Sequence, residues 1–143
     1  MAGVLCWLSA CGEAPTKIED LRATEITLPN GNKIMAETMR DKLDLARGMM
    51  FRDALRPKRG MLFVHPTPGR YSYWMYQTKV PLDIIWLGQD RRIVEITANT
   101  PPCTTAASQC PTFGGNHIAR YVLELNGGQA AAYGLKIGDE LRF

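Results

Sequence analysis

Short apolar segments separated by turn-forming residues constrain the fold of this chain more than any other feature of its sequence. The segments lie at residues 61–64, 71–75, 81–87, 92–96 and 121–125. They are rich in β-branched and aromatic residues, with Gly, Pro, Asn and Asp between them, which is typical of strands joined by turns. Strands that recur in this way indicate a mainly β domain, built as an antiparallel sandwich or barrel.

The first part of this domain contains a predicted hairpin followed by a short helix. Apolar and polar residues alternate over residues 26–36 around Asn30-Gly31, which is expected to supply the turn residues with positive φ. Thr38 suits the N-cap of the helix, with an acidic residue three positions later, and Gly48 suits its end. Apolar residues recur between these ends at helical spacing, at Met39, Leu43, Ala46 and Met50.

The remaining segments are expected to connect the strands or to end the sheet. Residues 66–70 (PTPGR) predict a turn, and residues 97–117 predict a long loop. Residues 127–134 (GGQAAAYG) predict a helical turn that ends at Gly134. Residues 137–143 predict a last strand, so the domain contains only one or two short helices.

The composition fits one globular domain and argues against nucleic acid as a partner. The chain has 143 residues, of which 45% are apolar and 22% are charged, and this suffices for a single core. Lys and Arg gather within residues 40–59, but Asp41, Asp44 and Asp53 interrupt them. A nucleic-acid surface usually carries a more continuous basic stripe. We therefore expect a solvated helix face and loop here, and no nucleic-acid partner.

Residues 1–11 carry no charge and end in LSAC at residues 8–11. A cysteine after small residues in this pattern resembles a bacterial lipobox, in which the cysteine becomes the lipidated first residue. No Lys or Arg precedes the apolar run, so we interpret residues 1–11 as a truncated lipoprotein-type signal segment, 12–23 as a tether and 24–143 as the folded domain. Lipidation of Cys11 would anchor an exported protein in the periplasm or on the outer face of a bacterial membrane. No other segment is apolar over the length that spans a bilayer.

Cys103 and Cys110 are the cysteines of the expected domain. Export would expose them to an oxidising compartment, where such a pair forms a disulfide, which would stabilise the domain by roughly 2–3 kcal/mol in the chain-entropy model. The alternative is a zinc site with four ligands, to which His65 and His117 could contribute. We predict the disulfide, and neither a metal nor another cofactor.

Several sequence blocks occur in an order that is typical of one family. They are residues 47–52 (RGMMFR), 60–63 (GMLF), 73–75 (YWM) followed by Thr78 and by 81–84 (PLDI), 93–94 (IV), the loop from 102–103 (PC) to 110–111 (CP), 121–125 (YVLEL) and 138–139 (GD). Together they resemble the DUF192 family over residues 24–143. The resemblance implies a compact, jelly-roll-like β sandwich with short helices, often exported. It implies no reaction, because no activity is assigned to the family as a whole.

The chain departs from the family pattern at His65 and Tyr73. The family usually has an apolar residue at the first of these positions and Phe at the second. Both replacements keep the bulk of the side chain. Because the family usually has an apolar residue at position 65, His65 is a poor candidate for a shared catalytic role.

Asp83 stands alone among the apolar residues of segment 81–87. Because strand side chains alternate, it points away from the side on which Leu82 and Ile84 lie. An unpaired buried carboxylate is very costly. Asp83 therefore either accepts hydrogen bonds that fix the 76–81 turn, or faces a cleft as a ligand-binding or catalytic group.

The candidate ligand-binding residues lie near this aspartate in the sequence or carry a guanidinium. They are Asp83, Thr78, Gln77, Tyr73, Arg47 and Arg52. Tyrosines can stack on a ligand or pack in the core, and the two arginines can hold an anion or form surface ion pairs with Asp44 or Glu124. No P-loop, nucleophile elbow or HExxH motif occurs, and we assign no catalytic residue.

Three hypotheses about function follow. The first is a non-enzymatic binding or accessory domain of the bacterial cell envelope, with a small polar molecule, a sugar or a peptide segment as ligand. The second is an envelope carbohydrate hydrolase that uses Asp83 as acid or base, which needs a second carboxylate across a cleft, from Glu95 or Glu124. The third is a purely structural partner protein, which would expose a large apolar patch.

Overall fold

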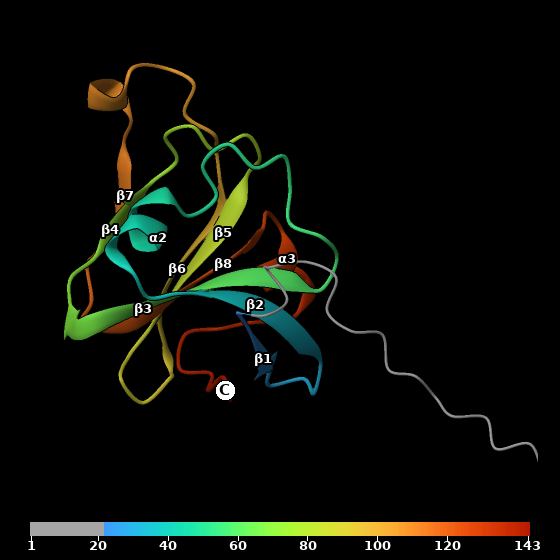
Figure 1. The fold of residues 1–143 in the computed structure, drawn as a ribbon. Helices are drawn as coiled ribbons and strands as arrows, with labels where there is room; N and C mark the ends of the chain where they lie inside the picture. Colours follow the sequence, from blue (N-terminus) through green and yellow to red (C-terminus); the bar gives the residue numbers. More distant parts are fainter. Residues whose placement is uncertain (1–21) are drawn as a thin grey trace, which may run out of the picture.

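A curved six-stranded sheet forms the centre of the molecule, and a two-stranded sheet lies beside it (Figure 1). The computed structural model describes residues 22–143, so the predicted signal segment, Cys11 and most of the predicted tether lie outside this range. The elements are β1 (Ala23–Thr27), β2 (Lys33–Met39), α2 (Lys42–Arg47), β3 (Arg59–Gly69), β4 (Ser72–Trp74), β5 (Leu82–Leu87), β6 (Ile93–Thr100), η1 (Ala107–Gln109), β7 (Thr112–Gly114), β8 (Ala119–Asn126) and α3 (Gln129–Ala132). The predicted mainly β fold with short helices is confirmed.

The strand order of the large sheet is β1-β2-β3-β8-β5-β6, and the small sheet pairs β4 with β7. All neighbouring strands are antiparallel except β2 and β3, which run parallel because α2 and its loop carry the chain back between them. Strand pairing does not join β1 to β6, so the sheet is not a closed barrel. The late strand β8 lies between β3 and β5, and the middle of the sheet therefore depends on segments far apart in sequence.

Each face of the large sheet carries its own apolar core. On one face, Phe63 and Trp86 pack with side chains from the loop after α2 and from the small sheet. On the other face, Leu62 and Leu123 pack with the β1–β2 hairpin, α3 and Leu141. Every residue of β5 is buried, because this strand is covered on both faces.

The helix is shorter than predicted and begins later. Thr38 belongs to β2, where its hydroxyl is hydrogen-bonded to that of Thr24 at 2.8 Å, and α2 begins after Asp41. The pairing of β2 with β3 continues as far as Met39, so sheet formation overrides the local capping pattern. Leu43, which was predicted on the apolar face of the helix, is 84% exposed.

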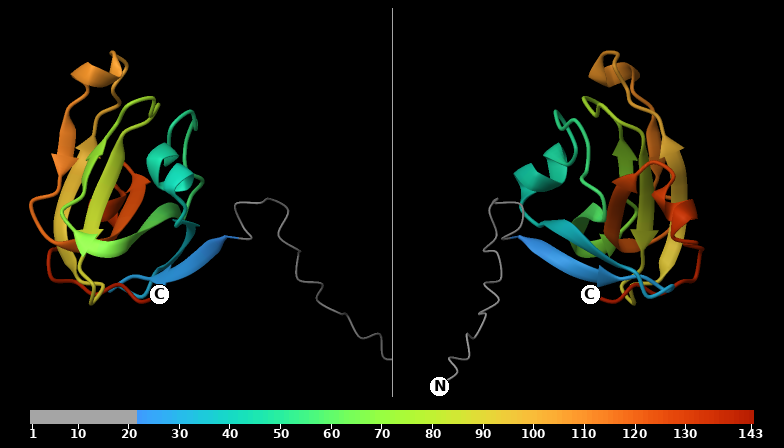
Figure 2. Two further views of the ribbon diagram at one scale, coloured as in Figure 1. Left: turned by 60° about the vertical axis from the view of Figure 1, so that its left-hand side comes forward. Right: turned by 90° about the vertical axis from the view of Figure 1, so that its right-hand side faces the viewer.

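Other segments also differ from the prediction. Residues 66–70 are not a turn, because β3 continues through most of them with an irregular register. The predicted loop 97–117 contains the end of β6, η1 and β7. Residues 137–143 form isolated bridges instead of a strand, one of them between Arg142 and Thr27 of β1. The views in Figure 2 show this last segment reaching the end of β1.

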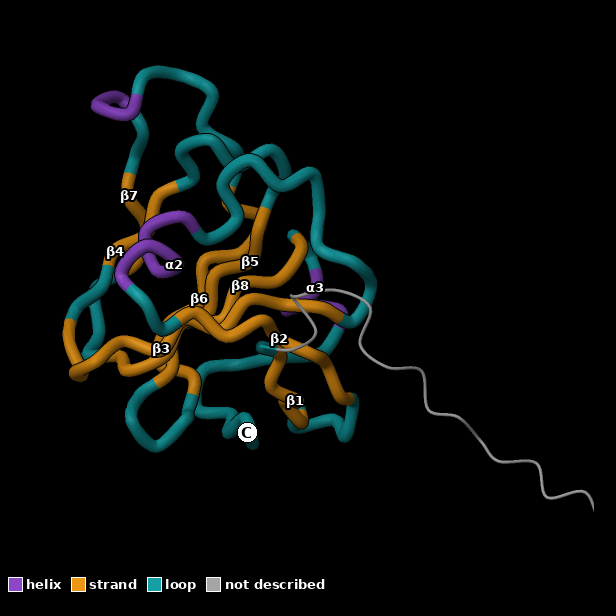
Figure 3. The backbone as a smooth tube through the Cα atoms, viewed as in Figure 1, coloured by secondary structure: helices purple, strands orange, loops and turns teal. Residues whose placement is uncertain are grey.

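The predicted disulfide joins Cys103 to Cys110, with their Cα atoms 5.8 Å apart. It belongs to the connection between β6 and β7, which projects from the molecule together with η1 (Figure 3). Within residues 22–143, no cluster of three or more His, Cys, Asp or Glu side chains is placed to hold a metal ion. No helix in the same range is long and apolar enough to cross a membrane.

Candidate functional site

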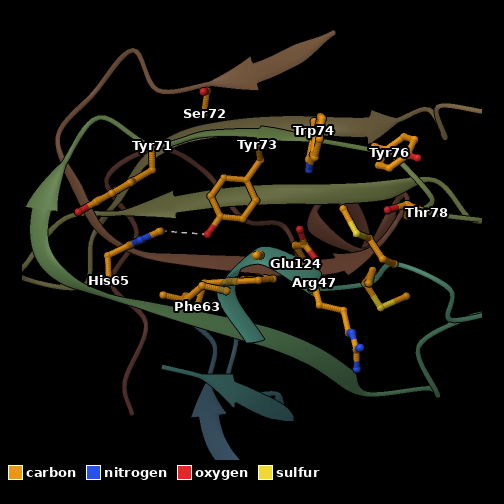
Figure 4. A pocket seen from close by; sticks show the side chains of 15 residues that line it. Arg47, Phe63, His65, Tyr71, Ser72, Tyr73, Trp74, Tyr76, Thr78 and Glu124 are labelled. Carbon is orange, nitrogen blue, oxygen red and sulfur yellow. Dashed lines mark hydrogen bonds between the residues drawn. The ribbon is translucent and has the colours of Figure 1, made fainter. Parts of the chain in front are cut away.

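A cavity of about 170 Å³ lies between α2 with its following loop and the side chains of β3 and β4. We call it the α2–β4 pocket. Its lining residues are Leu45, Ala46, Arg47, Gly48, Met49, Met50, Phe63, His65, Tyr71, Ser72, Tyr73, Trp74, Tyr76, Thr78 and Glu124. We call residues 71–76, which include β4, the β4 segment. Figure 4 shows the rings of this segment on one side, Phe63 on the other and Glu124 between them. The pocket is therefore lined by aromatic rings and has a carboxyl at its floor.

Gly48 lets the chain turn from α2 into the wall of this pocket. Its backbone has φ of 46°, and its amide donates a hydrogen bond to the carbonyl of Asp44 at 3.0 Å. A Cβ atom at this position would lie 3.0 Å from Cζ of Phe63. Glycine therefore allows both the turn and the close approach, and the next residue, Met49, is buried in the same core.

Edge-to-face ring contacts hold Tyr73 in the opposite wall. The centroid of its ring lies 5.2 Å from that of Phe63 and 5.9 Å from that of Trp86, with interplanar angles of 85° and 87°. Trp86 is itself fixed, because it is fully buried and its indole N–H donates to the carbonyl of Tyr71 at 2.7 Å. These contacts restrict where the Tyr73 hydroxyl can point.

His65 and Tyr73 form a hydrogen-bonded pair beside the cavity. Nε2 of His65 lies 3.0 Å from the Tyr73 hydroxyl, and the imidazole stacks on Tyr71 with ring centroids 3.5 Å apart. Burial, together with the charge of Arg120, lowers the pKa of His65 to about 4. Burial also raises the pKa of Tyr73 far above its usual value, and negative charge at Glu124 adds to this. Both side chains are therefore neutral at pH 7.

Glu124 brings a buried carboxyl to the floor of the pocket. The residue is 5% exposed, and its Oε2 has no hydrogen-bond partner within residues 22–143. Burial raises the pKa of Glu124 to about 8, although the charge of Arg52 opposes this shift. The carboxyl is thus mostly protonated at pH 7 and can donate one hydrogen bond while accepting another.

Three of the predicted ligand-binding residues line the pocket, namely Tyr73, Thr78 and Arg47. Thr78 is buried. Arg47 is exposed at the edge, and Figure 4 shows its side chain directed away from Glu124. The aromatic and polar stretch of the sequence therefore does contribute to a concave site.

Gln77 and Arg52 do not line this pocket. Gln77 is exposed with φ of 56°, and its carbonyl accepts a hydrogen bond from the amide of Phe51 at 2.9 Å. Arg52 binds both carboxylate oxygens of Glu37, at 2.6 and 3.1 Å. Each residue thus stabilises the loop after α2 from outside the pocket.

Asp83 is fully buried and does not line the pocket either. Its carboxylate accepts three backbone hydrogen bonds, from the amides of Asn99 at 2.8 Å, Gly128 at 3.0 Å and Ala130 at 2.7 Å. These donors belong to the end of β6 and the start of α3. Asp83 therefore ties these two segments to β5, and its partners are not in the 76–81 turn for which the sequence suggested a structural role.

Asp83 and Glu124 do not form the facing carboxylate pair that the hydrolase hypothesis needs. Asp83 stands opposite Leu125, and Glu124 stands opposite Ile84, so these neighbouring positions send the two carboxyls to opposite faces of the sheet. The carboxylate of Glu95 is bound to nitrogens of Asn116 at 3.1 and 2.6 Å.

From the sequence, Glu124 was considered only as a second carboxylate or an ion-pair partner, and neither Glu124 nor His65 was placed among the candidate ligand-binding residues, although both line the pocket. Glu124 is a lone carboxylate in an apolar strand, as Asp83 is, so the same signal was available in the segment 121–125. His65 differs, because its contact with Tyr73 depends on how β3 and β4 fold against each other. No local pattern in the sequence predicts that contact.

Comparisons with known proteins agree with this fold. The family model DUF192, described as Uncharacterized ACR, matches residues 25–143. The crystal structure of a protein of unknown function from Novosphingobium aromaticivorans has 31% sequence identity and a TM-score of 0.76, with 99% of this chain and 100% of that chain covered. The structure of a putative transcription regulator from Sinorhizobium meliloti has 28% identity and a TM-score of 0.73, with 82% and 89% covered. No curated protein sequence gives a significant match.

Proposed function

The chain belongs to the DUF192 family, and we propose that it is a non-enzymatic binding domain whose α2–β4 pocket takes a small organic ligand. The observation that carries the proposal is the buried carboxyl of Glu124, whose Oε2 is unbonded within the described range. An unsatisfied buried polar group costs about 1–3 kcal/mol, and native structures contain few of them. A ligand that hydrogen-bonds this oxygen would remove that cost.

The walls of the pocket indicate the shape of the ligand. Aromatic rings and the side chains of Met49 and Met50 offer apolar contact area, which small-molecule sites combine with a few fixed polar groups. A cavity of about 170 Å³ is smaller than sites for drug-sized molecules. The fitting ligand is a small molecule, or one side chain of a peptide, with an apolar body and one hydrogen-bonding end.

Binding is favoured over catalysis because the pocket lacks an activated nucleophile. The hydroxyl that His65 contacts belongs to Tyr73, and burial moves the pKa of Tyr73 further from neutrality. With a pKa near 4, His65 is also a weak base at pH 7.

The purely structural alternative has less support. The large apolar side chains that are exposed within residues 22–143 are Leu43, Phe51, Trp74, Ile118 and Ile137. They come from five separate parts of the chain, in α2, after α2, in β4, before β8 and after α3. Exposed residues from different elements do not by themselves make the large apolar patch that a dedicated partner surface needs.

A fragment screen by NMR on the ¹⁵N-labelled protein tests the binding function. Small fragments with an apolar body and one polar end are expected to shift the amide signals of Gly48 and Met49 and the indole signal of Trp74. Glu124→Ala is expected to weaken the best fragment by about tenfold or more, because a lost buried hydrogen bond costs about 1–3 kcal/mol.

Asp83→Asn provides the matched control, since it changes a buried carboxylate on the other face of the sheet. It should lower the free energy of unfolding, because it weakens the three backbone hydrogen bonds that the Asp83 carboxylate accepts. Fragment affinity should stay unchanged. Fragments that bind elsewhere, or that bind Glu124→Ala as tightly as the parent, would refute the proposed site.

We also propose that the domain acts in the bacterial cell envelope, anchored through lipidated Cys11. The disulfide between Cys103 and Cys110 supports this location, because disulfides persist in oxidising compartments. Expression from the native gene with radiolabelled palmitate should label the membrane fraction, and Cys11→Ser should abolish the label. A soluble, unlabelled protein would refute the anchor.

A further inference from the structure

The charges that face the α2–β4 pocket indicate which class of ligand it takes. We propose, building on the binding function above, that the ligand presents an organic cation, a primary ammonium or a guanidinium, which takes the place of the proton on Glu124. The empty pocket would hold a neutral carboxyl, and the filled pocket an ion pair between the ligand and the Glu124 carboxylate. The displaced proton passes to the solvent.

Glu124 is the group in the pocket wall that can change its charge near pH 7. The titratable and charged residues facing it from the surrounding elements are His65 on β3, Tyr71, Tyr73 and Tyr76 in the β4 segment, Arg47 on α2 and Arg52 in the loop after α2. His65 and Tyr73 are neutral at pH 7, for the reasons given above. Ionisation of Glu124 would therefore create a negative charge at the floor, which the charge of Arg52 counters only in part, because burial still raises the pKa of Glu124.

The two arginines do not provide the missing cation. Arg47 is exposed and its side chain points away from Glu124 (Figure 4), so solvent screens its charge. Arg52 is held by both oxygens of Glu37, at 2.6 and 3.1 Å, which offsets its charge. Within residues 22–143, Oε2 of Glu124 has no hydrogen-bond partner, which leaves its hydrogen-bonding capacity for a ligand.

The walls favour a cation over an anion or a neutral group. Ring faces carry negative quadrupole charge and attract ammonium and guanidinium groups, and the rings of Tyr73, Trp74 and Tyr76 line the cavity. A cation at the floor also gains a charge-assisted hydrogen bond to the carboxylate. A cation that binds at pH 7 must first displace the proton of Glu124, whose pKa is about 8. This lowers its affinity only about tenfold below the affinity for an already ionised carboxylate.

Isothermal titration calorimetry with three probes of similar shape tests the inference. The probes are n-butylguanidinium, its uncharged counterpart n-butylurea, and the anion n-pentanoate. At pH 7 we expect n-butylguanidinium to bind about tenfold or more tighter than n-butylurea, and n-pentanoate not to bind. Titrations in phosphate and in Tris, which differ in ionisation heat, should show the release of about one proton per bound cation.

The pH dependence gives a second readout. Affinity for n-butylguanidinium should rise about tenfold between pH 6 and pH 7 and level off above pH 8, as Glu124 loses its proton without the ligand. Glu124→Gln is isosteric with the protonated carboxyl, so it should fold, lose the preference for the cation and release no proton. Glu25→Gln, the same substitution at an exposed site on β1 outside the pocket, should behave like the parent.

Other outcomes overturn the inference and leave the binding function to be judged separately. Tighter binding of n-butylurea without proton release would assign a neutral ligand that uses the protonated carboxyl. Preference for n-pentanoate would assign an anion held at Arg47. Failure of all three probes would reject this ligand class, while the fragment screen would still decide whether the pocket binds anything.

Discussion

At the scale of single residues, two acidic side chains in similar sequence surroundings meet opposite environments. Asp83 and Glu124 each interrupt an apolar strand, and both are buried. Asp83 accepts three backbone amides, whereas Glu124 has an oxygen with no partner in the described range. Burial of the Glu124 carboxyl raises its pKa and favours the neutral form. The first residue therefore organises the fold, and the second is available for a ligand.

The raised pKa of Glu124 predicts that stability falls as the pH rises above neutrality. Its folded-state pKa is about 8, against an ordinary value of 4.5, so between these values the folded state binds more protons than the unfolded state. Stability from this group is complete below the unfolded pKa and is lost as the pH rises through the folded one. From pH 6.5 to pH 8 the free energy of unfolding should drop by about 2 kcal/mol.

Urea denaturation of the parent and of Glu124→Gln over this range measures the effect. The window avoids His65, whose lowered pKa acts in the opposite direction below pH 6.5. Glutamine does not titrate, so the variant should show a flat profile and exceed the parent in stability at pH 8. A parent profile as flat as that of the variant would mean that Glu124 is ionised at neutral pH.

The sequence located the site region but not its chemistry. Tyr73 and Thr78 could be predicted as lining residues because aromatic and polar residues are concentrated there. Whether Asp83 or Glu124 faced the cavity could not be predicted, because it depends on which face of the sheet α2 covers. That choice is made by packing between distant segments.

At the scale of elements, local sequence patterns predicted the turn of the β1–β2 hairpin correctly. They misplaced the start of α2, where pairing with a later strand decides the structure. The β1–β2 hairpin followed from Asn30-Gly31. In the structure only Gly31 of this pair has the predicted positive φ, 84°, and the side chain of Asn30 instead accepts a hydrogen bond from the amide of Asn32 at 2.9 Å. The start of α2 was misplaced because Thr38 is held in a strand by its pairing with Leu62 of β3. A capping pattern cannot reveal a partner that lies beyond the next loop.

The packing of the small sheet on the large one depends on Gly114 of β7. Its φ is 70°, and a Cβ atom would lie 2.1 Å from Cζ2 of Trp86. We expect Gly114→Ala to lower the free energy of unfolding by about 3 kcal/mol, because it adds steric overlap to backbone strain. Equilibrium denaturation followed by tryptophan fluorescence would measure the loss.

Gly134→Ala separates the two causes of this loss. Gly134 has nearly the same φ, 69°, but no atom lies within 4 Å of its added Cβ. It should lose only about 1 kcal/mol through backbone strain. Equal losses in the two variants would show that contact with Trp86 does not fix the position of the small sheet.

At the scale of the whole molecule, the segment after α3 connects the two edges of the large sheet. Thr27 of β1 exchanges backbone hydrogen bonds with Arg142, at 2.9 and 3.1 Å, and the amide of Ile93 at the start of β6 bonds to Asp139 at 2.9 Å. Leu141 is fully buried between them. A strand was predicted here because the residues alternate as in a strand. No regular strand forms, because the segment contacts two different edges of the sheet.

Leu141→Ala should therefore destabilise the whole domain, in spite of its position near the end of the sequence. Removal of a fully buried leucine leaves a cavity and costs about 3 kcal/mol. Ile137→Ala, in the same segment but 69% exposed, should change stability by less than about 0.5 kcal/mol. Thermal denaturation of the two variants would compare them, and similar melting temperatures would mean that the segment is only loosely attached.

The central position of β8 has a consequence for how the chain folds during synthesis. A ribosome releases β3 and β5 before it has made the strand that lies between them, so until then both strands have an unpaired edge. Such edges are sites of aggregation, and contacts between distant segments form slowly. The sheet cannot be completed until β8 and then residues 139–142 have emerged, which makes the interval before their release the period in which a nascent chain most needs protection.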